Sequence, residues 1–472
     1  MNETQDLLLI AAYVILTVVV GLLLRGRQSA ANDYFLGRDR IPWWLALFSI
    51  VATETSTVTF LSIPGVAYNG NLTFLQLPLG YIVGRLLIAA FLIPRFLDGE
   101  HMTLYEMLGQ RFGRVIQRLT SGIFIITRSI ADGLRLYLTA LVFRELLAWD
   151  MKWVVAVVGA LTIVYTFAGG LRAVVWTDLM QFVAYMAGAG IVAWIVLPQI
   201  NGGLGAVMSQ AAEAGKLQVF DWRFDLAVPF TFWSGLIGGA FISAASHGAD
   251  QMMVQRYLAT RSVQQARWAL GLSGFVVLVQ FAIFLVLGLV LFTFFQGQEF
   301  ASGDEVFARF IAQELPFGLR GLIVAAALSA AMSTLSSSLN SISAAAIADF
   351  YRPLVGACDE ARELRWARSL TVVAGLVQIA VALGSDQWGA ARSTVMAVIT
   401  IAAMTTGLTL GVLILGAAVR RADEKTAVMA MAVGAVVVVS VWWQGTVSGL
   451  WFALVGSATT FIVGALLAPK AR

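Results

Sequence analysis

The stretch Ala52-Thr-Glu-Thr-Ser-Thr-Val-Thr59, closed by Pro64-Gly65, places six polar side chains inside an otherwise apolar segment over 44–67. A second polar stretch, Ser243-Ala-Ala-Ser-His-Gly-Ala-Asp-Gln251, interrupts another apolar segment over 231–257. Inside a bilayer, irregular backbone is tolerated only where it lines a cavity, because hydrocarbon cannot satisfy its N–H and C=O groups. The two stretches therefore predict two broken helices that face a shared cavity.

The composition makes the bilayer the solvent of the whole chain. Of its 472 residues, 59% are hydrophobic and 12% are charged, with a mean hydropathy of +0.83. Apolar runs of about 17 to 25 residues, the length that crosses a membrane, recur along the chain and predict about thirteen transmembrane helices. We therefore expect one all-α transmembrane domain over 1–472.

The two broken spans lie five helices apart, so they cross the membrane in opposite directions. This arrangement is typical of transporters built from two inverted repeats, with the binding site near the bilayer midplane. The predicted division is an extra N-terminal helix over 7–25, a first repeat over 44–198, a second repeat over 231–419, and two extra C-terminal helices over 425–468.

The basic residues set the predicted orientation. Loops that carry Arg25, Arg95, Arg256, Arg352 and Arg420 all fall on one side if the N-terminus is outside, as the positive-inside rule requires. We expect an N-out, C-in protein of the cell (inner or plasma) membrane. The net charge of +4 is explained by these loops rather than by nucleic-acid binding.

A ladder of hydroxyls follows in the span over 320–351. Ser333, Ser336, Ser337, Asn340 and Ser343 recur at intervals of three and four, which aligns their side chains on one helical face. Such a face either packs closely against another helix or supplies oxygens to a hard cation such as sodium. The spacing alone leaves both interpretations open.

The sequence resembles the sodium/solute symporter family, which includes sodium-coupled glucose, proline, pantothenate and sialic-acid carriers. The matching motifs cover nearly the whole chain: Asp33-Tyr-Phe-Leu-Gly37, Phe60-Leu-Ser-Ile-Pro-Gly65, Tyr165-Thr-Phe-Ala-Gly-Gly170 with Trp176-Thr-Asp178, Asp250-Gln with Gln255-Arg-Tyr257, and Ser333-Thr-Leu-Ser-Ser-Ser-Leu-Asn-Ser-Ile-Ser343 with Asp349-Phe-Tyr. The resemblance implies a LeuT-type 5+5 inverted-repeat core whose first and sixth core helices are broken.

The resemblance also implies where Na+ binds. Carried over by motif, the family's common sodium site falls on Ala52, Thr55, Ala330, Ser333 and Thr334. A possible second sodium site falls on Asp178, Ser333, Ser336 and Ser337. The alternative for Asp178 is a carboxylate that stabilises a helix N-terminus near the cytoplasmic surface.

Solute contacts are expected from the two breaks and the helices beside them: Glu54, Ser56, Thr59, Gln76, Arg135, Ser246, His247 and Gln251. Arg128, Asp132 and Arg135 share one helical face, either as a self-neutralising set or with a guanidinium free for a carboxylate. The chain departs from sialic-acid carriers at Ala131 and from sugar carriers at Val58 and Thr59. Neither specificity follows from the resemblance.

The predicted function is sodium-coupled symport of a small polar organic solute by alternating access. An organic acid or zwitterion is favoured as the solute, and a sugar or polyol comes next. The alternatives are a proton-coupled carrier that titrates Glu54 or Asp178, and a transporter-like solute sensor. An enzyme is not expected, and the only partners inferred are the solute and the lipid bilayer, with no nucleic acid and no obligatory protein partner.

Overall fold

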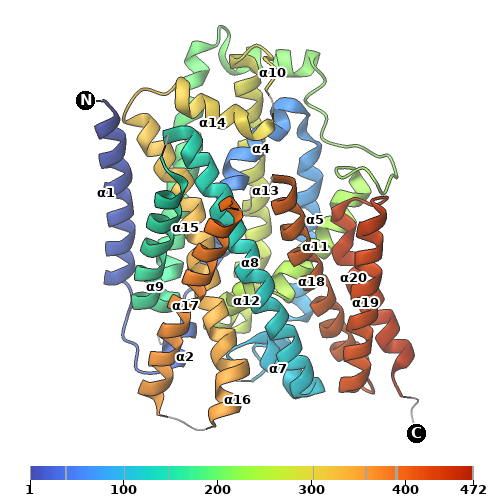
Figure 1. Ribbon diagram of the computed structural model, residues 1–472. Coiled ribbons are helices and arrows are strands. Elements are labelled where there is room, and N and C mark those ends of the chain that lie inside the picture. Colours follow the sequence, from blue (N-terminus) through green and yellow to red (C-terminus); the bar gives the residue numbers. More distant parts are fainter. Residues whose placement is uncertain are drawn as a thin grey trace.

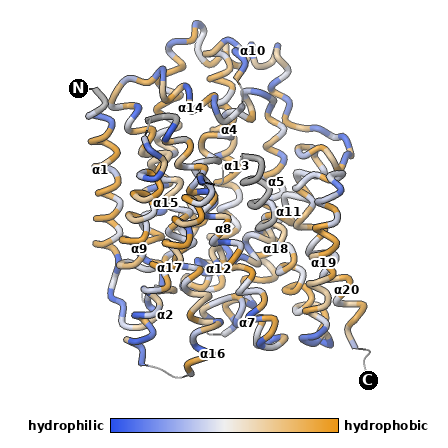
Figure 2. The backbone as a smooth tube through the Cα atoms, in the orientation of Figure 1, coloured by the Kyte–Doolittle hydropathy of each residue, from blue (hydrophilic) through white to orange (hydrophobic). Residues whose placement is uncertain are grey.

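The computed structural model describes residues 2–37, 40–99, 101–147, 149–300, 302–356, 359–387 and 392–469. Apart from an isolated bridge between Ile41 and Thr260, the regular structure of these residues is helical. Most long helices run between the two ends of the molecule (Figure 1), and the backbone between those ends is mainly hydrophobic (Figure 2).

The helices, in chain order, are α1 (Asn2–Leu23), α2 (Ala31–Leu36), α3 (Trp43–Glu54), α4 (Thr57–Asn69), η1 (Leu72–Leu75), α5 (Gln76–Phe91), α6 (Ile93–Phe96), α7 (Leu104–Phe112), α8 (Arg114–Leu147), α9 (Met151–Val196), η2 (Leu197–Gln199), α10 (Gly203–Glu213), the π-helix η3 (Ser234–Gly238), α11 (Gly239–Gly248), α12 (Gln251–Leu258), α13 (Val263–Phe294), α14 (Gly303–Gln313), α15 (Leu319–Ala345), the π-helix η4 (Ala346–Tyr351), α16 (Arg352–Val355), α17 (Glu360–Gln387), α18 (Arg392–Ala418), α19 (Glu424–Gln444), η5 (Gly449–Trp451) and α20 (Phe452–Leu467).

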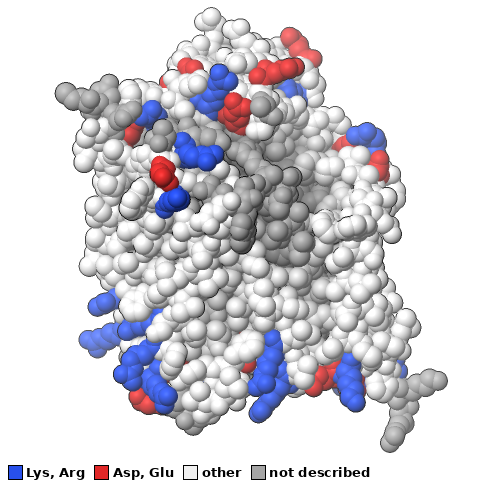
Figure 3. Space-filling model, in the orientation of Figure 1, with Lys and Arg blue, Asp and Glu red and all other residues white. Residues whose placement is uncertain are grey.

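Within the described residues, eight helices are long and apolar enough to cross a membrane, or nine if the bent pair α3 and α4 counts as one span. One of the eight is α9, which a backbone bend at Gly170 (φ 57°, ψ −160°) divides into two helices. Charged side chains gather at the two ends of the face seen in Figure 3 and leave a broad uncharged band between them. The total of thirteen spans and the N-out orientation stay predictions.

Helix α1 is attached to the core through Asp6. Its carboxylate accepts hydrogen bonds from the backbone N–H groups of Gly318 (2.7 Å) and Gly321 (2.8 Å) and from Nε of Arg320 (2.7 Å). The first N–H groups of a helix have no intrahelical acceptor and carry partial positive charge. Asp6 therefore supplies the acceptor that α15 lacks and holds the N-terminal ends of α1 and α15 together.

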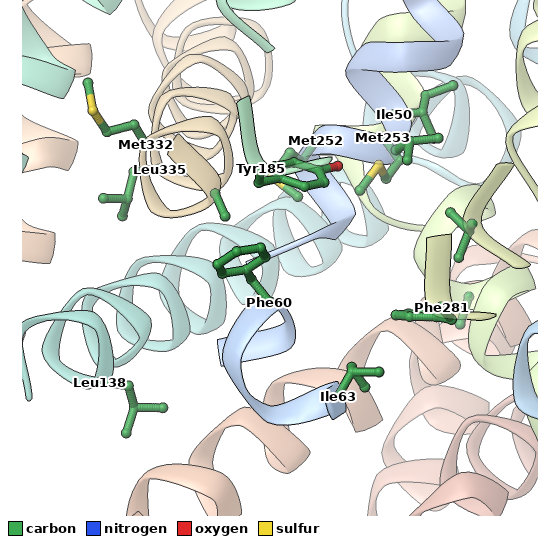
Figure 4. Packing of buried hydrophobic residues seen from close by; sticks show 14 of the residues in the cluster. Ile50, Phe60, Ile63, Leu138, Tyr185, Met252, Met253, Phe281, Met332 and Leu335 are labelled. Atoms are coloured by element: carbon green, nitrogen blue, oxygen red, sulfur yellow. The ribbon is translucent and has the colours of Figure 1, made fainter. Parts of the chain in front are cut away.

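The first predicted break is confirmed at Thr55 and Ser56. Both residues have extended backbone, and Ser56 starts α4 as its N-cap by accepting a hydrogen bond from the N–H of Thr59 (3.3 Å). The axes of α3 and α4 differ by 65°. Figure 4 shows the two halves with Ile50 on α3 and with Phe60 and Ile63 on α4.

The second break is narrower than the polar stretch that predicted it. Helix α11 continues through Ser243 to Gly248, and α12 begins at Gln251. The Asp250 carboxylate caps α12 by accepting a hydrogen bond from the N–H of Met252 (2.9 Å). Asp250 therefore restarts the helix as its N-cap, and the small residues of the preceding stretch stay helical.

Candidate functional site

The hydroxyl ladder of α15 faces the broken end of α3. Oγ1 of Thr334 donates a hydrogen bond to the carbonyl of Thr53 across 3.1 Å. Ser333, Ala330 and Ala52 have no exposed surface, and Thr334 is 5% exposed. The structure therefore brings the two parts of the predicted common sodium site together in the protein interior.

The end of α3 supplies backbone oxygens to the predicted common sodium site. A helix leaves its last four carbonyls without intrahelical partners, and those near the end of α3 include Ala52 and Thr53. The side chain of Thr55 accepts a hydrogen bond from Nε2 of Gln280 (2.7 Å), which fixes the C-cap residue of α3 against α13. Neutral carbonyl and hydroxyl oxygens around a buried point are the ligands that a hard cation prefers.

Asp178 lies beside these hydroxyls and has no exposed surface. Its carboxylate accepts hydrogen bonds from Oγ of Ser49 (2.5 Å) and Oγ of Ser333 (2.6 Å), and it forms an ion pair with Arg256 (3.1 Å). Its partners come from three helices, α3, α12 and α15. The charge of Asp178 is therefore compensated by these neighbouring helices. The prediction that Arg256 lies in a basic loop is wrong, because Arg256 lies in α12 and is buried. Its pairing with Asp178, 78 residues away, was not predicted.

The other two serines of the predicted second sodium site have different surroundings. Ser337 accepts a hydrogen bond from Nη2 of Arg256. Ser336 donates to the backbone carbonyl of Ser333 (3.1 Å), which turns its hydroxyl proton toward its own helix. Asp178, Ser333 and Ser337 are therefore linked by hydrogen bonds, with Arg256 among them.

Glu54, the last residue of α3, forms an ion pair with the fully buried Arg85 of α5. Arg85 also donates to Oγ of Ser273 on α13 (2.7 Å) and to Oγ of Ser243 on α11 (3.4 Å). A buried charge is tolerated where it is paired and hydrogen-bonded. The pair therefore explains the buried guanidinium and joins α3, α5, α11 and α13; sequence reasoning missed Arg85.

His247 lies near this pair and has no exposed surface. Its Nδ1 is 2.8 Å from the Tyr257 hydroxyl, and its Nε2 is 3.9 Å from Oε2 of Glu54. Nε2 has no hydrogen-bond partner among the described residues. The imidazole thus lies beside Glu54 but too far from it for a direct hydrogen bond.

The amides of the two predicted glutamines bind backbone groups. Gln251 accepts from the N–H of Leu104 (2.9 Å) and donates to the carbonyl of Met102 (3.0 Å), which ties α12 to the start of α7. Gln76 donates to the carbonyl of Phe230 (2.9 Å) and accepts from the N–H of Asp221 (3.1 Å). Both amides have structural partners, and their role as solute contacts stays a prediction.

The charged face of α8 extends to the second break. Asp132 pairs with both Arg135 and Arg128 (2.9 Å to Arg128), and Arg128 also reaches Asp250 (3.3 Å). Arg128, Arg135, Asp250 and Ser246 line a cavity of about 390 Å³ between α8, α11 and α18. Arg135 also lines a small cavity beside the first break, together with Ser56 and Thr334. The Arg135 side chain is 27% exposed. This partly exposed guanidinium therefore lines cavities beside both breaks.

Residues 34–434 match the family model for the sodium:solute symporter family. The chain belongs to this family. Family membership confirms the resemblance drawn from the motifs, and it makes the chain a sodium-coupled solute symporter rather than an enzyme.

Two bacterial relatives align over almost the full chain. The sodium/sialic acid symporter NanT of Aliivibrio fischeri is 30% identical over 99% of this chain and 93% of its own length, and the sodium/sialic acid symporter SiaT of Proteus mirabilis is 30% identical over 97% and 93%. The human sodium/iodide cotransporter is 28% identical over 84% of this chain and 62% of its own. The match therefore extends across both predicted repeats.

Solved structures confirm the transporter fold. The substrate-bound, outward-open state of a Na+-coupled sialic acid symporter, described as having a novel Na+ site, superposes with a TM-score of 0.91 at 28% identity, covering 99% of this chain and 98% of that one. The transporter Mhp1 with bromovinylhydantoin bound has a TM-score of 0.60 at 12% identity over 93% and 94%, which shows the fold alone.

Proposed function

We propose that this symporter binds Na+ between the broken end of α3 and the hydroxyls of α15, and that this ion couples solute uptake to the sodium gradient by alternating access. The backbone carbonyls of Ala52, Thr55 and Ala330 and the hydroxyls of Ser333 and Thr334 are the proposed ligands. The observation that carries the proposal is the contact of Thr334 with the Thr53 carbonyl, which joins the ladder to the break.

Sodium at this position acts as a removable link between two parts of the fold. A hard cation held by neutral oxygens attracts both the carbonyl end of α3 and the hydroxyls of α15. Its binding therefore favours the conformation in which the broken helix lies against α15, and that conformation forms the solute site. Release of the ion on the other side weakens the contact and allows the opposite opening.

For the solute we propose a small organic acid or zwitterion, with its carboxylate on Arg135 and its remaining polar groups on Ser56, Thr59, Glu54 and Ser246. The forked donors of a guanidinium suit a carboxylate, and Arg135 lines both cavities at the breaks. The names of several relatives support an anionic solute, since they specify sialic acid, iodide and monocarboxylate. A sugar or polyol would use the same hydroxyls without the carboxylate contact.

Coupling to sodium rather than to a proton agrees with the ion pairs of the two candidate titrating groups. Glu54 is paired with Arg85 and Asp178 with Arg256, so each carboxylate already has a compensating cation. A proton carrier needs a carboxylate that exchanges its proton during the cycle.

We also propose that the protein resides in the cell membrane, with the basic end of the molecule in the cytoplasm.

The test is a thermal-shift screen of the purified protein against organic acids, amino acids, polyols and sugars, each in sodium chloride and in choline chloride. A specific binder stabilises the folded state by mass action. We expect an organic acid or amino acid to raise the melting temperature in sodium and much less in choline. Equal stabilisation in both salts would contradict sodium coupling, and a response to neutral sugars alone would contradict the proposed solute class.

A further inference from the structure

Arginines from three separate parts of the chain gather at one end of the molecule. They are Arg25 and Arg27 in the loop after α1, Arg172 in α9, and Arg365 and Arg368 in α17. We propose that these five residues, the arginine patch, bind the head group of an anionic phospholipid whose acyl chains lie along the neighbouring apolar face of α9. The proposal does not depend on the sodium site, and it adds a lipid ligand to the symporter.

Gln28 holds the three segments together. Its Nε2 donates a hydrogen bond to the carbonyl of Gly169 at the bend of α9 (2.9 Å), and its Oε1 accepts one from Nη2 of Arg368 (2.9 Å). A Cβ atom placed on Gly169 would lie 3.6 Å from Cβ of Arg25. The loop after α1, the bend of α9 and the arginine of α17 therefore meet around one amide.

The remaining arginines lie next to this meeting point. The Arg172 side chain passes over Gly26, where a Cβ atom would lie 3.0 Å from its Cδ. Arg365 precedes Arg368 by three residues, so the two side chains share a face of α17. Arg27 and Arg365 are exposed. Figure 3 shows Lys and Arg side chains projecting at the lower left of the molecule, where the uncharged band ends.

The positive charge of the arginine patch is not balanced by neighbouring carboxylates. Within the part of the chain that the structure describes, the four arginines other than Arg172 form no ion pair. Two carboxylates of the same region are occupied elsewhere: Glu363 pairs with Arg352 (2.7 Å), and Asp33 accepts hydrogen bonds from backbone N–H groups at the start of α2. The patch therefore attracts an anion.

The surroundings of the patch favour a phospholipid as that anion. Phe167 is exposed on α9 and lies beside Arg368, whose Cζ is 6.0 Å from the ring centroid. Exposed side chains at helical spacing, Val164, Val157 and Trp153, continue the apolar face along α9. Forked guanidinium donors suit phosphate oxygens, and basic clusters beside transmembrane helices bind anionic head groups. The positive-inside rule explains basic residues at this end, but not their convergence beside an apolar face without carboxylates.

The experiment is a titration of the purified protein in detergent with phosphatidylglycerol or phosphatidylcholine, in which native mass spectrometry counts the bound lipid molecules. We expect the first phosphatidylglycerol to bind the wild type at least about tenfold more tightly than phosphatidylcholine, because several guanidiniums contribute. The variant Arg25→Gln/Arg365→Gln should lose this preference. Equal binding of the two lipids to the wild type, or a preference retained in this variant, would overturn the proposal.

The variant Arg420→Gln/Arg421→Gln is the matched control, because it removes the same charge from two exposed residues at the turn between α18 and α19. It should keep the preference for phosphatidylglycerol. An equal loss in this control would show that total charge attracts the lipid and would overturn the assignment to the arginine patch.

Inorganic phosphate distinguishes a lipid from a free anion. At the same concentration it should displace little phosphatidylglycerol, because it has no acyl chains to place on the apolar face of α9. Displacement as effective as that by phosphatidylglycerol itself would assign the patch to a free anion and refute the lipid. Melting temperatures measured without added lipid show that the variants compared are folded.

Discussion

Oγ of Ser333 donates a hydrogen bond to the carboxylate of Asp178 across 2.6 Å. Because the hydroxyl proton points at Asp178, the lone pairs of the same oxygen stay available for another partner. A hydroxyl polarised by a carboxylate is also a better acceptor, since hydrogen bonds in a chain strengthen one another. Asp178 therefore supports the proposed first sodium through Ser333 while its own charge is taken up by Arg256.

Replacing Ser333 should weaken sodium binding more than replacing Ser336 one turn away. Ser333→Ala removes a proposed ligand, and we expect the sodium affinity to fall about tenfold, which corresponds to about 1.4 kcal/mol. Ser336→Ala is the matched control, because the Ser336 hydroxyl bonds to its own helix. Sodium titration followed by thermal shift measures both variants. Equal effects of the two substitutions would argue against Ser333 as a ligand.

Glu54→Gln should destabilise the protein because it leaves the Arg85 guanidinium buried without a counter-charge. Removing one partner of a fully buried pair costs about 3–5 kcal/mol, and we expect less here because the Glu54 side chain is 21% exposed. Thermal unfolding in detergent gives the change in the stability of the variant. The double variant Glu54→Gln/Arg85→Met should recover part of the loss, and a single variant as stable as the wild type would show that the pair contributes nothing.

Gln251→Ala should lower stability more than it lowers solute affinity. The substitution leaves the N–H of Leu104 and the carbonyl of Met102 unpaired, at a cost of about 1–3 kcal/mol for each buried group. Arg135→Gln is the contrasting variant, for which we expect a roughly tenfold rise in the half-saturating solute concentration. Uptake of the solute identified by the thermal-shift screen measures the solute affinity of both variants. A large loss of solute affinity in Gln251→Ala, without loss of stability, would make the glutamine a solute contact.

Asp6→Asn should loosen the attachment of the N-terminal helix. The neutral amide keeps one oxygen but loses the charge that favours the α15 N-terminus and the Arg320 contact, so we expect a loss of about 1–2 kcal/mol. Gln5→Ala, at the exposed neighbouring position, is the control. Thermal unfolding compares the two variants, and indistinguishable melting temperatures would mean that Asp6 is not an anchor.

The local features of the fold could be predicted from the sequence where they depend on short-range chemistry. Consecutive Thr and Ser residues around Glu54 indicated the first break, and the polar stretch over 243–251 indicated the second. The second polar stretch predicted too long an interruption, because Ser243 and Ser246 satisfy their hydroxyls inside the helix and against a neighbour. Ser and Thr residues are often accommodated in helices in this way.

The charged partners could not be predicted, because pairing across helices depends on the tertiary arrangement. Arg85 lies 31 residues from Glu54, and Arg256 lies 78 residues from Asp178, and no local pattern links either pair. Arg256 also follows the second break closely in the sequence, and this position predicted a basic residue of a cytoplasmic loop. An intramembrane carboxylate predicts that a cation lies nearby but does not say which one.

The most direct test of sodium binding at the break is a sodium titration of the wild type beside the double variant Ser333→Ala/Thr334→Ala, with choline replacing sodium at constant ionic strength. We predict that sodium raises the melting temperature of the wild type in a saturable manner, and that the double variant needs at least about a hundredfold more sodium for the same rise. An unchanged sodium dependence in the double variant would contradict the proposed ion site between α3 and α15.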